Sequence, residues 1–305
     1  MLNAGSGKGG AESARDELQR LFSEAGHEVT IALNHSGEEL TAALQAAIAS
    51  GADTIVAGGG DGTVNAVANA IIDRDVTLGV LPLGTLNHFA RDLSIPLELA
   101  AAAKVVIDGH TTRVDVGEVN GRVFLNNSSV GIYPRIVQLR ERYRARGAAK
   151  WIIATWATFR VTRNTRAKRL DLTVDGQRLR ETTPLVFVGN NAYRMSGFDA
   201  ASRESLTQGT LALYVVGVEQ QHHLLRLVWR ILAGTAVASG ELTESLAQEA
   251  IIDRPGDSAG IPVPVAVDGE VGTLELPLRY RIRPASLSVC VPVSTTTQEI
   301  DMRLP

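Results

Sequence analysis

Three consecutive glycines, Gly58–Gly60, stand between an apolar segment and a helical pattern, and no other feature of the sequence limits its fold as strongly. Residues 53–57 before them read as a short buried strand, and residues 63–72 after them have helical periodicity. Consecutive glycines let the backbone approach an anion closely, with the N–H groups of the turn and helix directed at it. The pattern predicts a phosphate-binding loop, although a tight turn without a ligand would use the same residue type.

Strand and helix patterns alternate through the first third of the chain. Apolar residues recur at helical spacing, as at Leu18, Leu21 and Phe22. The expected helices cover residues 11–25, 38–50, 63–72 and 97–108, and the expected strands cover 28–33, 53–57 and 77–81. Strands that alternate with helices of this length predict a parallel sheet with helices on both faces.

From about residue 114 the pattern changes to short alternating segments. The expected strands cover 114–119, 122–126, 169–174, 184–188, 211–218, 263–267 and 287–292. Asn120-Gly121, Asp175-Gly176 and Asp268-Gly269 are strong hairpin signals. Two helical interruptions are expected, at about 134–168 and 220–249. This part is therefore predicted to be mainly antiparallel, as a sandwich or a distorted barrel.

The length of 305 residues allows two ordinary domains, and the 45% hydrophobic and 21% charged composition is that of a globular protein. We expect an α/β domain over 1–117, a β-rich domain over 118–292, and a C-terminal tail over 293–305 that returns to the first domain. The single cysteine, Cys290, excludes an intrachain disulfide and fits a reducing cytoplasm. No signal-like segment begins the sequence, and no apolar stretch of roughly 18 residues is present.

Charge is distributed unevenly along the chain. Residues 1–117 hold 7 Lys and Arg against 15 Asp and Glu, whereas residues 135–180 hold 13 against 3. The basic stretch 139–169 mixes arginines with aromatic and aliphatic residues such as Trp151 and Trp156. This mixture predicts a basic amphipathic helix that contacts an anionic membrane peripherally, although its apolar face could equally pack on the β-rich domain.

Two common nucleotide motifs are excluded. Gly7-Lys8 is followed by Gly9, and Leu2 stands where a Walker A loop has its first glycine. A dinucleotide fingerprint beginning at Gly58 or Gly60 would need its final glycine at Thr63 or Asn65. The phosphate loop is therefore of a third kind.

Four elements, in order along almost the whole chain, resemble the diacylglycerol kinase family. GGGDGTVNAV at 58–67 resembles the GGDGT loop of diacylglycerol, sphingosine and bacterial lipid kinases, a loop shared more distantly with NAD kinases and phosphofructokinases. PLGTLNHFAR at 82–91 is similar to the family's P-x-G-T-x-N-D-F-A-R segment. NAGSG at 3–7 is similar to its N-P-x-S-G loop, and Asp268-Gly269-Glu270 to its D-G-E catalytic turn.

The resemblance implies a three-layer α/β nucleotide-binding domain and a β-sandwich domain for a lipid substrate, with ATP and Mg²⁺ in a cleft between them. The residues it assigns to ATP are Asn3, Gly5, Ser6, Gly7, Asn34, Gly59, Gly60, Asp61, Gly62, Thr63, Asn65, Thr85 and Asn87. It implies an ATP-dependent lipid kinase, cytoplasmic and peripheral at the inner membrane face.

Phosphoryl transfer to an alcohol requires a group that takes the hydroxyl proton, and a carboxylate suits this task. The D-G-E match makes Asp268 the expected base and Glu270 its partner or a nucleotide or metal contact. Asp61 is expected to organise the metal or the loop. An ordinary hairpin turn at Asp268-Gly269 and a helix N-cap at Asp61 remain the structural alternatives.

Three departures from the family pattern bear on activity. His88 stands where the family has Asp, and Gln208 stands before Gly209 where the family has an acidic residue. Two missing carboxylates predict a weak or absent structural Mg²⁺ site, since Mg²⁺ prefers anionic oxygen ligands. Only Met1 and Leu2 precede Asn3, so either the start is placed too late or the sheet lacks its first strand.

Other functions remain open from the sequence. An NAD-kinase-like enzyme with a soluble substrate shares the glycine loop but not the 82–91 segment. A catalytically weak nucleotide or lipid sensor is favoured only by His88 and Gln208. Nucleic-acid binding lacks an accompanying motif. The lipid acceptor and the oligomeric state, with a homodimer as one option, are not determined.

Overall fold

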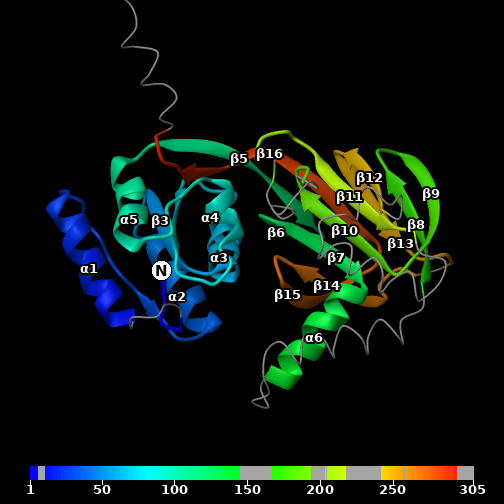
Figure 1. Ribbon diagram of the computed structural model, residues 1–305, viewed down its shortest axis with the longest axis horizontal. Coiled ribbons are helices and arrows are strands. Elements are labelled where there is room, and N and C mark those ends of the chain that lie inside the picture. Colours follow the sequence, from blue (N-terminus) through cyan, green and yellow to red (C-terminus); the bar gives the residue numbers. More distant parts are fainter. Residues whose placement is uncertain are drawn as a thin grey trace, which may run out of the picture. The chain divides into compact units, whose positions relative to one another are not determined.

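The computed structural model describes residues 1–5, 11–144, 167–193, 203, 205–217, 242–256 and 258–293, with side chains omitted at 139–144 and 242. The chain divides into two compact units (Figure 1). Unit 1 consists of Met1–Val114 and the segment from Ser286 onward, and unit 2 is Asp115–Ala285. The boundaries between the units fall within two strands, β5 (Thr111–Val119) and β16 (Leu278–Cys290).

Unit 1 is built on a parallel sheet. Its strands are β1 (Leu2–Asn3), β2 (Leu33–Asn34), β3 (Thr54–Gly59), β4 (Thr77–Pro82) and the end of β16, in the order β2-β1-β3-β4-β16. The central strands are nearly continuous runs of buried apolar residues, as expected for a sheet covered on both faces. The predicted parallel sheet is therefore confirmed.

Helices cover both faces of this sheet. They are α1 (Ala11–Glu24), α2 (Gly37–Ala49), α3 (Asp61–Ile71), α4 (His88–Asp92) and α5 (Leu99–Asp108). Figure 1 shows α1 and α5 on one side of β3, and α3 and α4 on the other. Gly79 of β4 allows α5 to pack closely, because a Cβ atom there would lie 3.1 Å from Val106.

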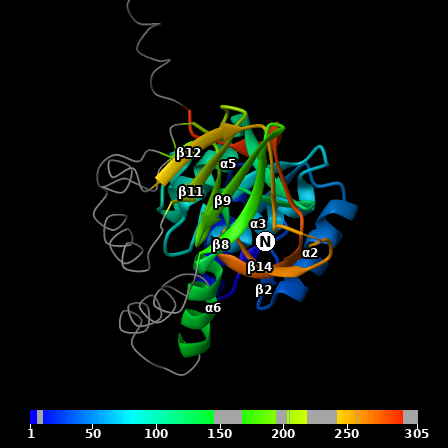
Figure 2. The same cartoon turned by 90° about the vertical axis from the view of Figure 1, so that its right-hand side faces the viewer.

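Unit 2 is a sandwich of antiparallel sheets. One contains β5, β6 (Arg122–Phe124), β8 (Lys168–Val174), β9 (Gln177–Thr183), β13 (Glu249–Asp253) and the start of β16. The other has the order β12-β11-β10-β7-β14-β15, formed by Leu242–Ala247, Leu211–Val216, Leu185–Asn190, Asn127–Gly131, Pro262–Val267 and Glu270–Glu275. Figures 1 and 2 show β11 beside β12 at one edge of this second sheet.

An apolar core fills the sandwich, with Phe124 and Tyr280 in edge-to-face contact at a ring-centroid distance of 6.3 Å. One helix, α6 (Ile132–Arg144), follows β7 and packs near β14 and β15. The predicted antiparallel sandwich is thus confirmed. All three predicted hairpin turns form as well, because the residues of Asn120-Gly121, Asp175-Gly176 and Asp268-Gly269 all have positive φ and connect strands in two-residue loops.

Several predicted elements differ in the structure. The strand expected at 28–33 is reduced to Leu33–Asn34, because β1 offers it only two residues for pairing. The helical interruption expected at 220–249 is wrong at its end, since β12 and the start of β13 are strands that complete sheets. Most of the basic stretch 139–169 and the rest of 220–249 lie outside the described residues.

No helix in the described part of the chain is long and apolar enough to span a bilayer.

Candidate active site

The glycine loop lies where the strand order of unit 1 reverses. β1 pairs with β2 on one side and with β3 on the other, so neighbouring connections diverge between β1 and β3. In open α/β sheets a ligand crevice forms at the carboxyl ends of the strands at such a switch point. Asn3, Asn34 and Gly59 end the three strands concerned, so the expected nucleotide residues gather at this edge.

Close packing explains the first two glycines of the loop. A Cβ atom on Gly58 would lie 2.6 Å from the Leu2 side chain, and one on Gly59 would lie 2.4 Å from Thr63 Oγ1. Gly60 is the N-cap of α3. Because glycine has no side chain, no N-cap side chain accepts a first-turn N–H of this helix. By contrast, Ser36 caps α2 and Glu98 caps α5. The first-turn N–H groups of α3 thus lack a side-chain cap, which suits an anion.

A second loop packs directly on the first. A Cβ atom on Gly84 would lie 2.4 Å from the Cα atom of Gly60, so only glycine permits this approach. Asn87, which is buried, shapes this loop. Its Oδ1 accepts the Gly84 N–H at 3.0 Å, and its Nδ2 donates to the carbonyls of Pro82 and Gly84 at 3.2 and 3.0 Å. The side chain of Asn87 therefore organises the loop, while Thr85 is exposed at its tip.

Asp61 joins the two loops. It is the first residue of α3 and does not cap that helix. Its Oδ1 instead accepts the N–H of Phe89, the second residue of α4, at 3.2 Å. The N-cap alternative for Asp61 is therefore wrong, because Gly60 holds that position in α3. Asp61 instead accepts a first-turn N–H of α4, and this bond fixes the 82–91 segment against the glycine loop.

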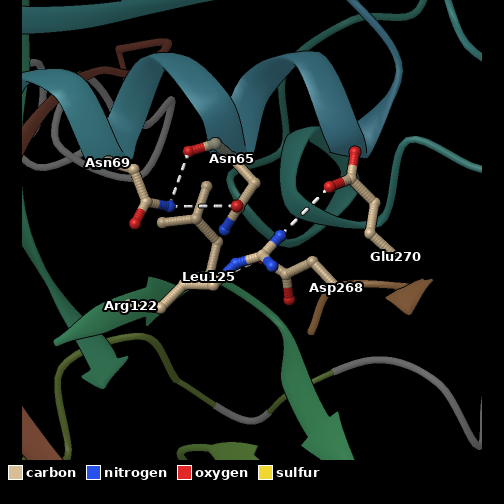
Figure 3. Close-up of polar contacts among 6 residues, drawn as sticks. All are labelled: Asn65, Asn69, Arg122, Leu125, Asp268 and Glu270. Carbon is tan, nitrogen blue, oxygen red and sulfur yellow. Dashed lines mark hydrogen bonds and ion pairs between the residues drawn. The ribbon is translucent and has the colours of Figure 1, made fainter. Parts of the chain in front are cut away.

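The remaining unit 1 candidates lie close to the switch point. Asn3 Nδ2 donates to Thr63 Oγ1 at 3.3 Å, and Asn3 Oδ1 accepts the Gly5 N–H at 2.9 Å. Asn34 is buried and pairs with Asn3 between β1 and β2. Asn65 in α3 accepts from Asn69 Nδ2 at 3.0 Å (Figure 3). Ser6 and Gly7 lie outside the described residues.

In unit 2, Asp268 lies at the turn between β14 and β15, and its carboxylate accepts three backbone N–H groups. Oδ2 accepts from Leu125 at 2.7 Å (Figure 3). Oδ1 accepts from Asn126 and Asn127 at 2.8 and 2.9 Å. Burial raises the pKa of Asp268, and these three hydrogen bonds and the charge of Arg203 oppose that rise. Asp268 is therefore both a structural turn residue and a half-buried carboxylate of raised pKa.

Arg203 supports the segment that holds Asp268. This buried guanidinium donates to the Leu125 carbonyl, to Asn126 Oδ1 at 3.0 Å and to the Asn190 carbonyl at 3.3 Å. Tyr193 Oη donates to the Asn126 carbonyl at 3.0 Å. The backbone around the Asp268 carboxylate is thus fixed by two side chains that the sequence analysis did not single out.

Glu270 has a different environment from Asp268. Its carboxylate forms an ion pair with Arg122 of β6 at 3.1 Å (Figure 3), and its side chain is 60% exposed. Exposed pairs of this kind contribute roughly 0–1 kcal/mol. The carboxylate of Glu270 is therefore exposed and paired with an arginine, whereas that of Asp268 is held by three backbone N–H groups.

Asp115 was missed by the sequence analysis although it is buried. Its Oδ2 accepts the Gly209 N–H at 2.7 Å, and its Oδ1 accepts the Ala285 N–H at 2.8 Å. Gln208, which is neutral, accepts the Ala192 N–H at 3.3 Å. An acidic residue inside the apolar run of β5, which is buried on both faces from Val114 to Val119, was the available signal.

The residues of unit 1 fit a nucleoside triphosphate, because the uncapped start of α3 and the glycine contacts leave backbone donors for phosphates. Asp61 supplies a carboxylate beside them, and carboxylate oxygen is a ligand type that Mg²⁺ accepts. Within the described residues, no group of three or more His, Cys, Asp or Glu side chains gathers in a metal-binding arrangement.

Family models match both parts of the chain. The diacylglycerol kinase catalytic domain matches residues 1–119. The YegS C-terminal NAD kinase beta sandwich-like domain matches residues 127–291.

Named relatives agree with these matches. A diacylglycerol kinase of Staphylococcus haemolyticus is 27% identical over 310 residues, covering 98% of this chain and 89% of the relative. One from Staphylococcus aureus is 30% identical over 226 residues, covering 70% and 69%. Two solved structures from Bacillus anthracis share the fold, with TM-scores of 0.73 and 0.68 at 23% and 21% identity, covering 96% of this chain and 96% and 95% of theirs. The chain belongs to the diacylglycerol kinase family of lipid kinases.

Proposed function

We propose that this chain transfers the γ-phosphoryl group of ATP to the hydroxyl of a neutral lipid, diacylglycerol or a close analogue, at a membrane surface. Unit 1 holds the nucleotide and unit 2 supplies the base. Family membership supports the lipid acceptor, and the uncapped start of α3 supports the phosphate site.

Backbone N–H groups of the glycine loop and of the first turn of α3 would bind the triphosphate oxygens. Asn3, Gly5 and Thr63 would contact the nucleotide from the end of β1 and the start of α3. Asp61, whose carboxylate accepts the Phe89 N–H, would orient a bound Mg²⁺. A bound Mg²⁺ would offset the negative charge on the phosphates.

Asp268 would take the proton of the lipid hydroxyl. As that oxygen forms its bond to the γ-phosphorus, the bond from phosphorus to the ADP oxygen breaks and the hydroxyl proton passes to the Asp268 carboxylate. A raised pKa suits this role, because a general base works best when its pKa lies near the operating pH. The observation that carries the assignment is the half-buried carboxylate of Asp268, which three backbone N–H groups hold in place.

The test is transfer of label from γ-labelled ATP to a lipid panel in anionic vesicles with Mg²⁺. Wild type, Asp268→Asn and the control Asp175→Asn are compared, because Asp175 begins another Asp-Gly hairpin turn. We expect labelled lipid from wild type and the control, and a loss of roughly 10²–10⁴-fold in Asp268→Asn. Label in a soluble acceptor alone, or no transfer by a chain that still binds ATP, would overturn the proposal.

Membrane contact through the basic stretch 139–169, and a cytoplasmic location at the inner membrane face, form part of the same proposal. The positive charge of stretch 139–169 supports this contact, since anionic lipids attract nearby Lys and Arg by about 1 kcal/mol each. Sedimentation with vesicles of rising phosphatidylglycerol content checks it. Binding should rise with anionic lipid and fall with salt, and binding that depends on neither would contradict it.

A further inference from the structure

A recess opens at one end of the unit 2 sandwich. Its apolar walls come from both sheets and include Val130, Leu170, Leu185 and Ile252. The cavity volume is about 50 Å³. One buried water needs roughly 10–15 Å³ on this measure, so the recess admits a short run of methylene groups and not a whole diacyl tail.

Three cations surround this apolar recess: Arg135 of α6, Lys168 at the start of β8, and Arg254 just after β13. All three line the same recess, and partial burial together with the charges of Arg254 and Arg135 lowers the pKa of Lys168. The ion pairs of unit 2 among the residues with described side chains use other arginines, namely Arg122, Arg180, Arg281 and Arg283. The three cations thus repel one another around one opening, an arrangement that an anion would relieve.

The recess is separate from the Asp268 turn. It is lined by Val263 and Pro264, at the start of β14, whereas Asp268 follows the end of that strand. The four residues from Pro264 to Asp268 span about 13 Å at the usual rise of a strand. A head group at the three cations would therefore not present its oxygen to Asp268. Nor does a neutral lipid alcohol require three cations.

We propose that this recess is a second binding site, which takes the anionic head group and first methylenes of a single-chain amphiphile. The head, a phosphomonoester or carboxylate, lies among Arg135, Lys168 and Arg254. The start of its chain lies against Leu170, Leu185 and Ile252. The site binds this ligand whether or not the chain phosphorylates a lipid, so its test needs neither ATP nor an acceptor.

The test is calorimetric titration of the full chain, below the aggregation concentration of each probe. Decyl phosphate and decanoate carry both parts of the ligand, methyl phosphate carries the head alone, and decyltrimethylammonium carries the chain with the opposite charge. We expect decyl phosphate to bind at least about tenfold more tightly than methyl phosphate, with no measurable binding of the cationic probe.

Two variants and one matched control assign the site. Lys168→Glu should weaken decyl phosphate by about tenfold or more. Arg169→Glu makes the same charge change at the next residue, which is exposed and points to the opposite face of β8, and it should bind as wild type does. Leu185→Trp, which fills the recess without changing charge, should lower decyl phosphate affinity toward that of methyl phosphate. Thermal unfolding of each variant shows whether it is folded.

Four results would overturn the proposal. Unchanged binding in folded Lys168→Glu, or equal loss in Arg169→Glu, would remove the site from this recess. Equal affinities of methyl and decyl phosphate would leave a plain anion site. Binding to anionic vesicles that falls in Lys168→Glu, with no binding of monomeric decyl phosphate, would make these cations a bilayer contact instead.

Discussion

Asp268 and Asp175 occupy the same position in two type I′ turns, and the carboxylate of each accepts backbone N–H groups from a neighbouring strand. Asp175 accepts from Gln248 and Glu249, and its own N–H donates to the Glu249 carbonyl. Asp268 repeats this arrangement with the segment from Leu125 to Asn127. Their surroundings differ, since Asp175 is exposed while burial raises the pKa of Asp268.

Asp268→Asn is expected to fold but to lose activity. One carboxylate oxygen becomes an NH₂ group, so one of the backbone donors loses its acceptor, at about 1–3 kcal/mol of unfolding free energy. Urea unfolding measures this cost, and the kinase assay measures the larger loss in rate. Asp175→Asn should lose less stability because water replaces the lost acceptor at its exposed turn, and its activity should be that of wild type. Equal activity losses in the two variants would show that Asp268 acts only as a turn residue.

The pH dependence of activity and of stability should report Asp268 in opposite directions. Because the folded-state pKa is raised, the base is protonated at acid pH, and kcat/KM should rise with pH to a midpoint above the ordinary aspartate value. The folded state binds the proton more tightly than the unfolded state. The contribution of Asp268 to stability is therefore greatest below its unfolded pKa and declines as pH rises through the folded pKa.

Measuring kcat/KM and urea midpoints across acid pH, in wild type and in Asp268→Asn, checks both parts. Asp268→Asn should lack this decline in stability. An acid limb at or below the ordinary aspartate pKa would contradict the raised value.

Gly84→Ala should separate the two loops of unit 1. The new Cβ atom would lie 2.4 Å from the Cα atom of Gly60 and 2.7 Å from Asn87 Oδ1, so backbone must move. We expect a stability loss of about 1–3 kcal/mol and weaker ATP binding, measured by thermal unfolding and nucleotide titration. Gly37→Ala is the control, because its Cβ atom meets nothing within 4 Å at the start of α2. It should stabilise the chain by about 0.4–1 kcal/mol and leave ATP affinity unchanged. Unchanged ATP affinity in Gly84→Ala would show that this approach is not needed for the nucleotide.

Removing the charge of Arg203 should raise the pKa of Asp268 further, because that charge is one of the influences that lower it. In Arg203→Met the acid limb of the pH–rate profile should move to higher pH. The variant also leaves the Leu125 and Asn126 oxygens without this donor, so a stability loss of about 3–5 kcal/mol is expected.

Arg203→Lys keeps the charge and should return the acid limb toward wild type, even where the stability loss remains. Arg281→Met, which removes an arginine with a 57% exposed side chain, should not shift the limb. If Arg203→Lys and Arg203→Met have the same profile, the role of Arg203 is packing alone.

The sequence predicted those parts of the fold that depend on local chemistry. The glycine loop, the alternation in unit 1 and the three hairpin turns follow from residue type and periodicity over a few positions. β2 depends instead on its partner, because a two-residue β1 cannot pair with a longer strand. α4 has five residues, too few for a periodic pattern, and its start is held by Asp61 from another element.

The candidate site divides in the same way. Gly59, Gly60, Asp61 and Asp268 stand in recognisable local motifs, so the sequence indicated them. Arg203 and Asp115 act on segments far away in the chain, at Leu125 and Gly209, and no short motif contains either pair. The structural roles of Asp61 and Asn87, as a cap for α4 and as the organiser of its own loop, also required the folded geometry.

Asn120 begins the third turn of this kind, and its Oδ1 accepts the Arg279 N–H at 2.8 Å without any charge. A neutral amide therefore suffices to dock such a turn. One nucleotide change, from an aspartate to an asparagine codon, would then remove the carboxylate at position 268 and keep the docked turn. Under the proposed role of Asp268, a single mutational step would remove catalysis and keep a folded scaffold, which would leave a short evolutionary path from a kinase to a binding protein.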